Sequence, residues 1–113
     1  MRAIPKSLLI HTVMLHKKVN EDRWGKGELD SGKKLTYVRI EPSRKIIRDK
    51  NNAEIQLAAT LFYDCKNSRP RDAVFEMDDI IIFNGMKHQV MLIEPLYDNK
   101  HLHHYEVGLI KSG

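Results

Sequence analysis

The clearest structural signal in the chain lies in residues 79–93, DIIIFNGMKHQVMLI. Two apolar runs with the composition of strands flank the dipeptide Asn84-Gly85. Asn-Gly adopts the two positive φ angles of a type I′ turn, whose twist suits the joining of two antiparallel strands. The sequence therefore predicts a tight β-hairpin that turns at Asn84 and Gly85.

Alternation of apolar and polar side chains predicts four more strands, at residues 7–16, 35–41, 54–64 and 103–110. In 54–64 one face would carry Ile55, Leu57, Ala59, Leu61 and Tyr63, and this alternation outweighs the helix propensity of the Ala, Leu, Glu and Gln residues there. Six strands and no helical periodicity predict an all-β fold, either a small antiparallel β-barrel or a sandwich, in one domain over residues 1–113.

Polar segments separate these strands. Residues 17–34, which include Trp24, read as a long hairpin loop, and residues 43–52 and 65–72 read as further loops. Pro95, Asp98 and Asn99 mark a second turn region, and short helical turns fit residues 2–6 and 77–79. The predicted architecture is thus a small β-domain with long polar loops.

The composition restricts the class of protein. The chain has 113 residues, 42% of them hydrophobic, and a formal net charge of +4. Its longest apolar runs have four residues, whereas a membrane helix needs roughly 20. Pro5 and the absence of a cleavage-site pattern argue against a secretory signal. A single cysteine, Cys65, excludes an internal disulfide and fits a reducing compartment. We therefore expect neither a membrane span nor secretion.

No residue pattern predicts catalysis. Two imidazoles of His101, His103 and His104 would share one strand face, but a defined zinc site needs three or four ligands. Cys65 has no base that the sequence places beside it, as a nucleophile requires. Adjacent Asp78 and Asp79 would point to opposite faces and suit a turn better than acid–base chemistry. We predict no enzymatic activity, no metal site and no cofactor.

Two basic segments are candidates for contact with partners. The first combines basic residues with two adjacent isoleucines, and we predict an assembly interface there; its residues are Arg44, Lys45, Ile46, Ile47, Arg48 and Lys50. Isoleucines in a polar loop suggest an apolar anchor, either docked on the domain or reserved for a neighbouring subunit. A secondary basic loop contains Lys66, Arg69 and Arg71.

Several runs of the chain resemble a family of small minor capsid proteins of tailed bacteriophages and of prophages. They are IQLAATLFYDCKNSRP at 55–70, DIIIFNG at 79–85, HQV at 88–90, EPLYD at 94–98 and HHYE at 103–106. The wider group includes the head-completion, or stopper, proteins of the head–tail connector. The resemblance covers most of residues 1–111 and carries structural rather than catalytic motifs.

The resemblance implies a concrete role. Stopper-type proteins are small β-barrels with a long loop that assemble as a ring below the portal and adaptor, close the packaged head and receive the tail. The implied partners are portal, adaptor and tail proteins and further copies of the chain, with no membrane partner and with contact to packaged DNA left open. The implied locations are the bacterial cytoplasm during assembly and then the virion.

One alternative from another class stays open. A basic β-barrel of the OB type binds single-stranded nucleic acid through aromatic residues on an exposed strand face. The eight aromatic residues lie mostly in predicted strands, where core packing explains them, and no alternation of basic and aromatic residues appears. The connector interpretation is therefore preferred.

Overall fold

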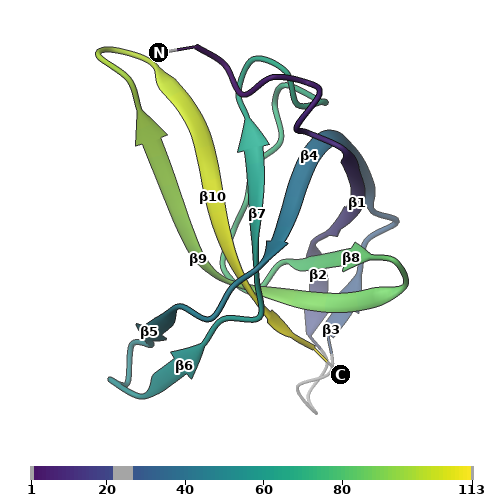
Figure 1. Cartoon of the computed structure of the whole chain (residues 1–113). Coiled ribbons are helices and arrows are strands. Elements are labelled where there is room, and N and C mark those ends of the chain that lie inside the picture. Colours follow the sequence, from purple (N-terminus) through teal and green to yellow (C-terminus); the bar gives the residue numbers. More distant parts are fainter. Residues whose placement is uncertain (1, 22–26, 113) are drawn as a thin grey trace.

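The computed structural model describes residues 2–21 and 27–112, which form ten β-strands and no helix (Figure 1). Six strands close an antiparallel barrel in the order β1-β4-β7-β10-β9-β8, and β2–β3 and β5–β6 form two separate hairpins that project from it. The all-β barrel predicted from the sequence is confirmed. No part of the described chain forms a helix suited to spanning a membrane. In chain order the strands are β1 (His11–His16), β2 (Lys18–Glu21), β3 (Gly27–Leu29), β4 (Lys33–Pro42), β5 (Ile46–Arg48), β6 (Glu54–Gln56), β7 (Ala59–Asp64), β8 (Ile80–Phe83), β9 (Met86–Tyr97) and β10 (Leu102–Lys111).

The barrel core is built from the apolar face of each strand. In β7, Leu61 and Tyr63 are buried, whereas the intervening Phe62 is half-buried on the outer face. The Tyr63 ring packs with Phe75 and Tyr105 at centroid distances of 5.5 and 6.3 Å. Removal of this apolar surface from water is the main stabilising contribution to the barrel.

The hairpin at Asn84-Gly85 forms as predicted. Asn84 and Gly85 have φ angles of 51° and 74°, and the flanking pair Phe83 and Met86 closes the β8–β9 ladder. Nothing lies within 4 Å of the position that a Cβ atom would take on Gly85. Glycine is therefore required here for its backbone conformation and not for space.

Two predicted strands are shorter than expected. β1 begins at His11 rather than at residue 7, because the chain turns after Pro5, whose carbonyl accepts the N–H of Leu8 at 2.9 Å. The predicted strand 54–64 is divided into β6 and β7, because the chain bends at Ala58 and joins the barrel ladder only at Ala59. Buried and half-buried residues alternate through this bend. The apolar alternation in the sequence therefore predicts one strand where the structure has two.

Both long segments that we predicted as loops contain strands. Residues 17–34 include β2 and β3, and Trp24 of this segment lies outside the described residues. Residues 43–52 include β5, which pairs with β6. Strands of three or four residues are too short to produce a period-two pattern.

The C-terminal hairpin is longer than predicted. β9 continues through Pro95, and the turn begins at Asp98, whose Oδ1 accepts the N–H of His101 at 3.1 Å. Pro95 pairs with Tyr105 of β10. The pairing of β9 with β8 ends at Gln89, so within the described residues β10 is the one strand that pairs with β9 at Pro95. A strand with one partner tolerates a residue that lacks an N–H donor.

The N-terminal segment, residues 2–10, crosses one end of the barrel and is held there by the buried side chain of Asp64 (Figure 1). Asp64 Oδ1 accepts the N–H of Ile4 at 2.9 Å, and Oδ2 accepts those of Lys66 and Asn67 at 3.1 and 2.8 Å. The Asn67 amide donates to Ile4 O at 2.8 Å. One carboxylate thus fixes the turn after β7 and the segment that covers it.

Candidate assembly interface

The predicted assembly segment forms a projecting β-hairpin, residues 44–57, which we call the arm (Figure 1). In its ladder Ile46 is opposite Gln56, Ile47 is opposite Ile55 and Arg48 is opposite Glu54. Directly opposed residues share a face, so Ile47 and Ile55 form one half-buried apolar face. Ile46 lies on the other face and is 60% exposed. Of the two isoleucines predicted as an anchor, Ile46 is the one that faces solvent.

The base of the arm is anchored on the outside of the barrel. Leu57 is buried, and its Cδ1 would lie 2.8 Å from a Cβ atom on Gly108 of β10. The Leu57 side chain therefore occupies the space that any larger residue at position 108 would need. The arm is also tied to β9 by the Lys45 Nζ–Glu94 Oε1 ion pair at 3.1 Å. These contacts fix the direction in which the arm projects.

The charged residues of the arm differ in their partners. Arg48 contacts Glu54 Oε1 at 3.1 Å and donates to Asn52 O at 3.0 Å across the turn. Arg44 and Lys50 are exposed and have no hydrogen bond or ion pair within the described part of the chain. The arm therefore combines one exposed apolar side chain with two cations that are free to meet another surface.

The second basic group is not brought together with the first. Lys66, Arg69 and Arg71 lie in the loop after β7, at the end of the barrel opposite to the arm (Figure 1). Arg69 Nη1 donates to the carbonyls of Lys66 and Ser68 at 2.7 and 2.9 Å, and its backbone forms a bridge with Thr36. Arg69 therefore stabilises its own loop, and of these three residues only Lys66 and Arg71 are exposed.

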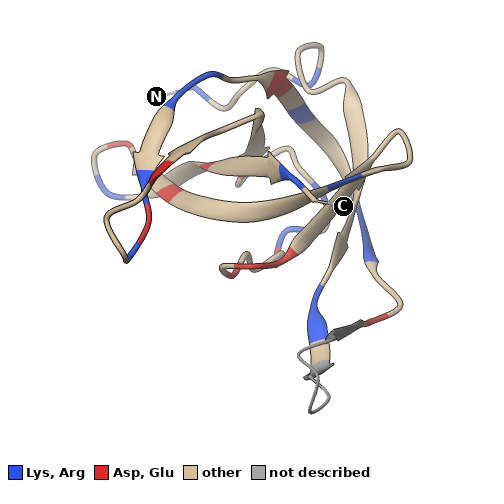
Figure 2. Cartoon of the chain, turned by 90° about the horizontal axis from the view of Figure 1, so that it is seen from below, with Lys and Arg blue, Asp and Glu red and all other residues tan. Residues whose placement is uncertain are grey.

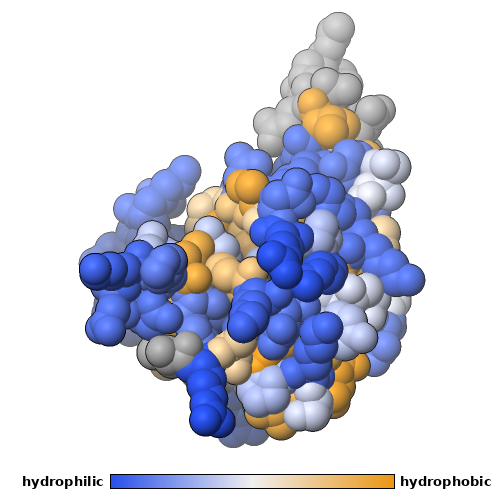
Figure 3. All heavy atoms as spheres, turned by 90° about the horizontal axis from the view of Figure 1, so that it is seen from above, coloured by the Kyte–Doolittle hydropathy of each residue, from blue (hydrophilic) through white to orange (hydrophobic). Residues whose placement is uncertain are grey.

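An apolar groove lies between the N-terminal segment and the outer face of β4 and β7. It has a volume of about 380 Å³ and is lined by Ile4, Leu8, Leu9, Arg39, Glu41 and Phe62. Leu8 is 50% exposed at the groove, and Arg39 Nε contacts Glu41 Oε1 at 3.4 Å beside it. Figure 3 looks onto the end of the barrel with the N-terminal segment and shows apolar patches separated by polar surface.

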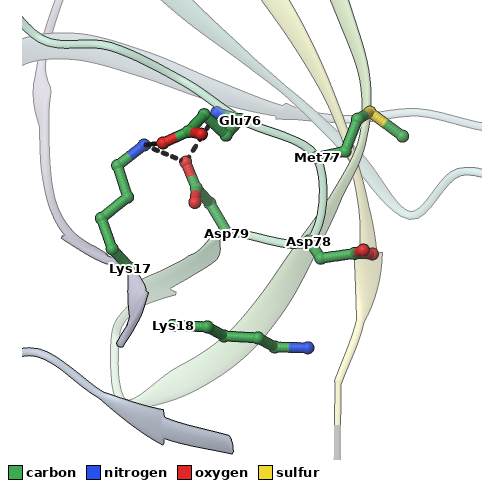
Figure 4. Close-up of a pocket in the computed structure, with 6 residues that line it drawn as sticks. All are labelled: Lys17, Lys18, Glu76, Met77, Asp78 and Asp79. Atoms are coloured by element: carbon green, nitrogen blue, oxygen red, sulfur yellow. Dashed lines mark hydrogen bonds and ion pairs between the residues drawn. The ribbon is translucent and has the colours of Figure 1, made fainter. Parts of the chain in front are cut away.

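A smaller pocket at the junction of β1 and β2 is charged (Figure 4). The Lys17 amine points between two carboxylates, 2.5 Å from Asp79 Oδ2 and 3.3 Å from Glu76 Oε1, and donates to Val74 O at 2.6 Å. Asp79 also accepts the N–H of Glu76 at 2.7 Å. The Lys17 ammonium is thus bound by structural partners, and Asp79 has the turn and strand-start role predicted for it.

The C-terminal histidines contact one another differently from the prediction. His103 Nδ1 lies 2.7 Å from His104 Nδ1, although adjacent strand residues should point to opposite faces. A register shift between Leu102 and His104 in the β9–β10 pairing accounts for this. His104 Nε2 contacts Glu106 Oε2 at 2.9 Å, and His101 lies outside the strand. Within the described residues no three His, Cys, Asp or Glu side chains form a metal-binding group.

The thiol of Cys65 is not activated. Burial, together with the charge of the adjacent Asp64, raises the pKa of the Cys65 thiol. A thiol with a raised pKa has a smaller thiolate fraction at neutral pH than a free cysteine. Its side chain serves as a partly buried apolar group at the end of β7.

Sequence reasoning missed three features of this surface. The contact between Leu57 and Gly108 had a sequence signal, because Gly108 lies inside a predicted strand. A glycine at such a position often indicates that another part of the chain packs closely against the backbone. The role of Asp64 was signalled by the turn-forming residues that follow it. The groove had no sequence signal, because segments distant in the chain form it.

A family model described as "Minor capsid protein" matches residues 5–109. Neither the comparison with curated proteins nor that with solved structures gave a significant match. The match spans nearly the whole chain, including five barrel strands in full, most of β10 and the arm. The chain therefore belongs to the minor capsid protein family.

Proposed function

We propose that this protein is a structural component of the head–tail connector of a tailed phage or prophage. In this proposal it assembles between the portal and the tail and helps to close the packaged head. Membership of the minor capsid protein family supports a structural role in the virion. The runs at 55–70, 79–85, 88–90, 94–98 and 103–106 resemble small minor capsid proteins of tailed phages, and the wider group includes head-completion proteins, which supports the finer position.

The observation that carries the proposal is the exposure of Ile46 on an anchored arm. An isoleucine that is 60% exposed between basic residues contributes little to the stability of a single subunit. Burial against a neighbour would add roughly 25 cal/mol for each Å² of apolar surface removed from water. The arm is thus suited to joining subunits, and we assign no catalytic step to the protein.

The alternative of single-stranded nucleic-acid binding has less support. Figure 2 shows Lys and Arg spread around the molecule with Asp and Glu between them, rather than collected in one groove. Tyr63 and Phe75 are buried in the core, so they are not available for base stacking. The exposed Tyr37 and Tyr97 lie on β4 and β9, which are not neighbours in the barrel. A titration of short single strands at several salt concentrations tests this alternative, because phosphate contacts produce a strong salt dependence.

The connector proposal is tested by complementation of a phage that lacks the gene. We expect Ile46→Asp to give heads that lose their packaged DNA and free tails that fail to join, as seen by electron microscopy. The matched control is Val74→Asp, because Val74 is 63% exposed but lies outside the arm. Joined particles from Ile46→Asp at the wild-type yield, or a failure to form heads at all, would refute the proposal.

A further inference from the structure

The groove is a preformed site with fixed walls. On one side the N-terminal segment is held by the Ile4–Asp64 hydrogen bond and by Arg39 Nη1, which donates to Leu8 O at 3.0 Å. On the other side Phe62 projects from β7. Its volume of about 380 Å³ lies within the range of roughly 300–1,000 Å³ typical of binding pockets. The groove can therefore accept an apolar side chain without first opening.

The exposed face of the arm complements this groove in both polarity and charge. Ile46 lies on the same face as the Arg48–Glu54 ion pair, since residues two apart on a strand share a face. The groove likewise places its apolar lining beside the Arg39–Glu41 ion pair. With Ile46 seated in the groove, Arg48 can pair with Glu41 and Glu54 can pair with Arg39. Such exchange of partners favours one register of contact over others.

The arm does not fill the groove of its own chain. Its base is anchored to β10 by Leu57 and to β9 by Lys45, whereas the groove lies on β4 and β7. Ile46 remains 60% exposed in the single chain. The occupant that matches the groove is therefore the arm of another molecule.

We propose that the arm of one subunit inserts Ile46 into the groove of a second copy of the chain, next to Leu8 and Phe62. This contact joins two different surfaces, so the subunit that gives its arm keeps a free groove and the subunit that gives its groove keeps a free arm for further neighbours. Repetition of such a heterologous contact gives a ring when its rotation closes. The inference rests on the proposed role of the arm in assembly and specifies its partner.

Crosslinking of purified protein tests the proposal without a phage. In a Cys65→Ser background, Ile46→Cys and Leu8→Cys are introduced together and treated with a short bismaleimide. We expect a ladder of dimers, trimers and larger species on a denaturing gel. Ile46→Cys or Leu8→Cys alone should remain at least about tenfold less crosslinked. An equal mixture of the two single variants should give dimers only. One variant then has a thiol on the arm and the other has a thiol at the groove, so each chain can form one crosslink.

Three results would overturn the proposal. One is a monomer after treatment, with circular dichroism showing that the variant is folded. Another is an intramolecular crosslink. Both thiols of one chain would then have reacted, and mass spectrometry would give the mass of a monomer plus one linker. The third is efficient dimer formation by Ile46→Cys alone, which would mean that arms meet arms. If crosslinking fails while Ile46→Asp still blocks head–tail joining, the arm contacts another connector protein and the proposed function stands.

Discussion

The barrel and the arm differ in how their side chains are used. In the barrel, Leu35, Val38 and Leu61 are completely buried, and strands of up to 12 residues pair with their neighbours. In the arm two three-residue strands pair with each other, and Ile46 faces solvent. An isolated two-stranded hairpin is marginal in water, so the arm depends on its anchor at Leu57. The barrel thus determines stability and the arm presents a contact surface, and mutations should separate these two roles.

The largest effect on stability is expected at Asp64. Asp64→Ala leaves the N–H groups of Ile4, Lys66 and Asn67 without their acceptor. A fully buried donor left unpaired costs about 1–3 kcal/mol. These three hydrogen bonds are part-buried, so we expect a total loss of roughly 2–3 kcal/mol in the free energy of unfolding, measured in urea. The control is Asp72→Ala, which alters an exposed carboxylate in the following loop. Equal effects of the two variants would contradict the role assigned to Asp64.

The next effect concerns the turn between β8 and β9. Gly85→Val forces a β-branched residue to a φ of 74°, and we expect a loss of about 1–2 kcal/mol because left-handed backbone is unfavourable for such side chains. Gly85→Asn should lose much less, since asparagine tolerates this conformation. Thermal unfolding of both variants measures the difference. A Gly85→Val protein as stable as the wild type would exclude the strained-turn explanation.

The connection between the two regions is tested at Gly108. Gly108→Ala places a Cβ atom 2.8 Å from Leu57 Cδ1 and 3.0 Å from Leu92 Cβ, and overpacking of this kind costs about 1–3 kcal/mol. Leu57→Ala removes the first of these contacts, so the double variant should be more stable than the sum of the two single effects predicts. Strict additivity in the double-mutant cycle would mean that Leu57 does not anchor the arm over Gly108.

The smallest effect concerns Cys65. Because burial raises the pKa of its thiol, the folded protein holds less thiolate than the unfolded chain at the same pH. Alkylation at pH 8 should therefore be slower in the folded protein than in urea. The raised pKa contributes stability that is present below the pKa of the unfolded thiol and is lost as the pH rises through the folded value. Cys65→Ser should reduce this alkaline loss. A faster reaction in the folded state would instead indicate an activated thiol.

The six strands of the barrel could be predicted because each is long enough, or apolar enough, to display its pattern. The hairpin at Asn84-Gly85 was the clearest case, since two residues determine its turn. The arm could not be predicted, because its pairing is carried by only three residues on each side. The exposure of Ile46 rather than Ile47 depends on the register of that pairing. The groove forms where the N-terminal segment packs against the barrel. Its residues are far apart in the chain, so no local sequence pattern predicts it.

The separation of stability from assembly is tested most directly by the unfolding of Ile46→Asp. An exposed position outside the core should change the free energy of unfolding by no more than about 0.5 kcal/mol. We predict that purified Ile46→Asp unfolds in urea within this margin of the wild type, while the same variant fails to join heads to tails. A loss of more than about 1 kcal/mol would show that Ile46 supports the fold of its own chain, and would contradict the assignment of the arm to assembly.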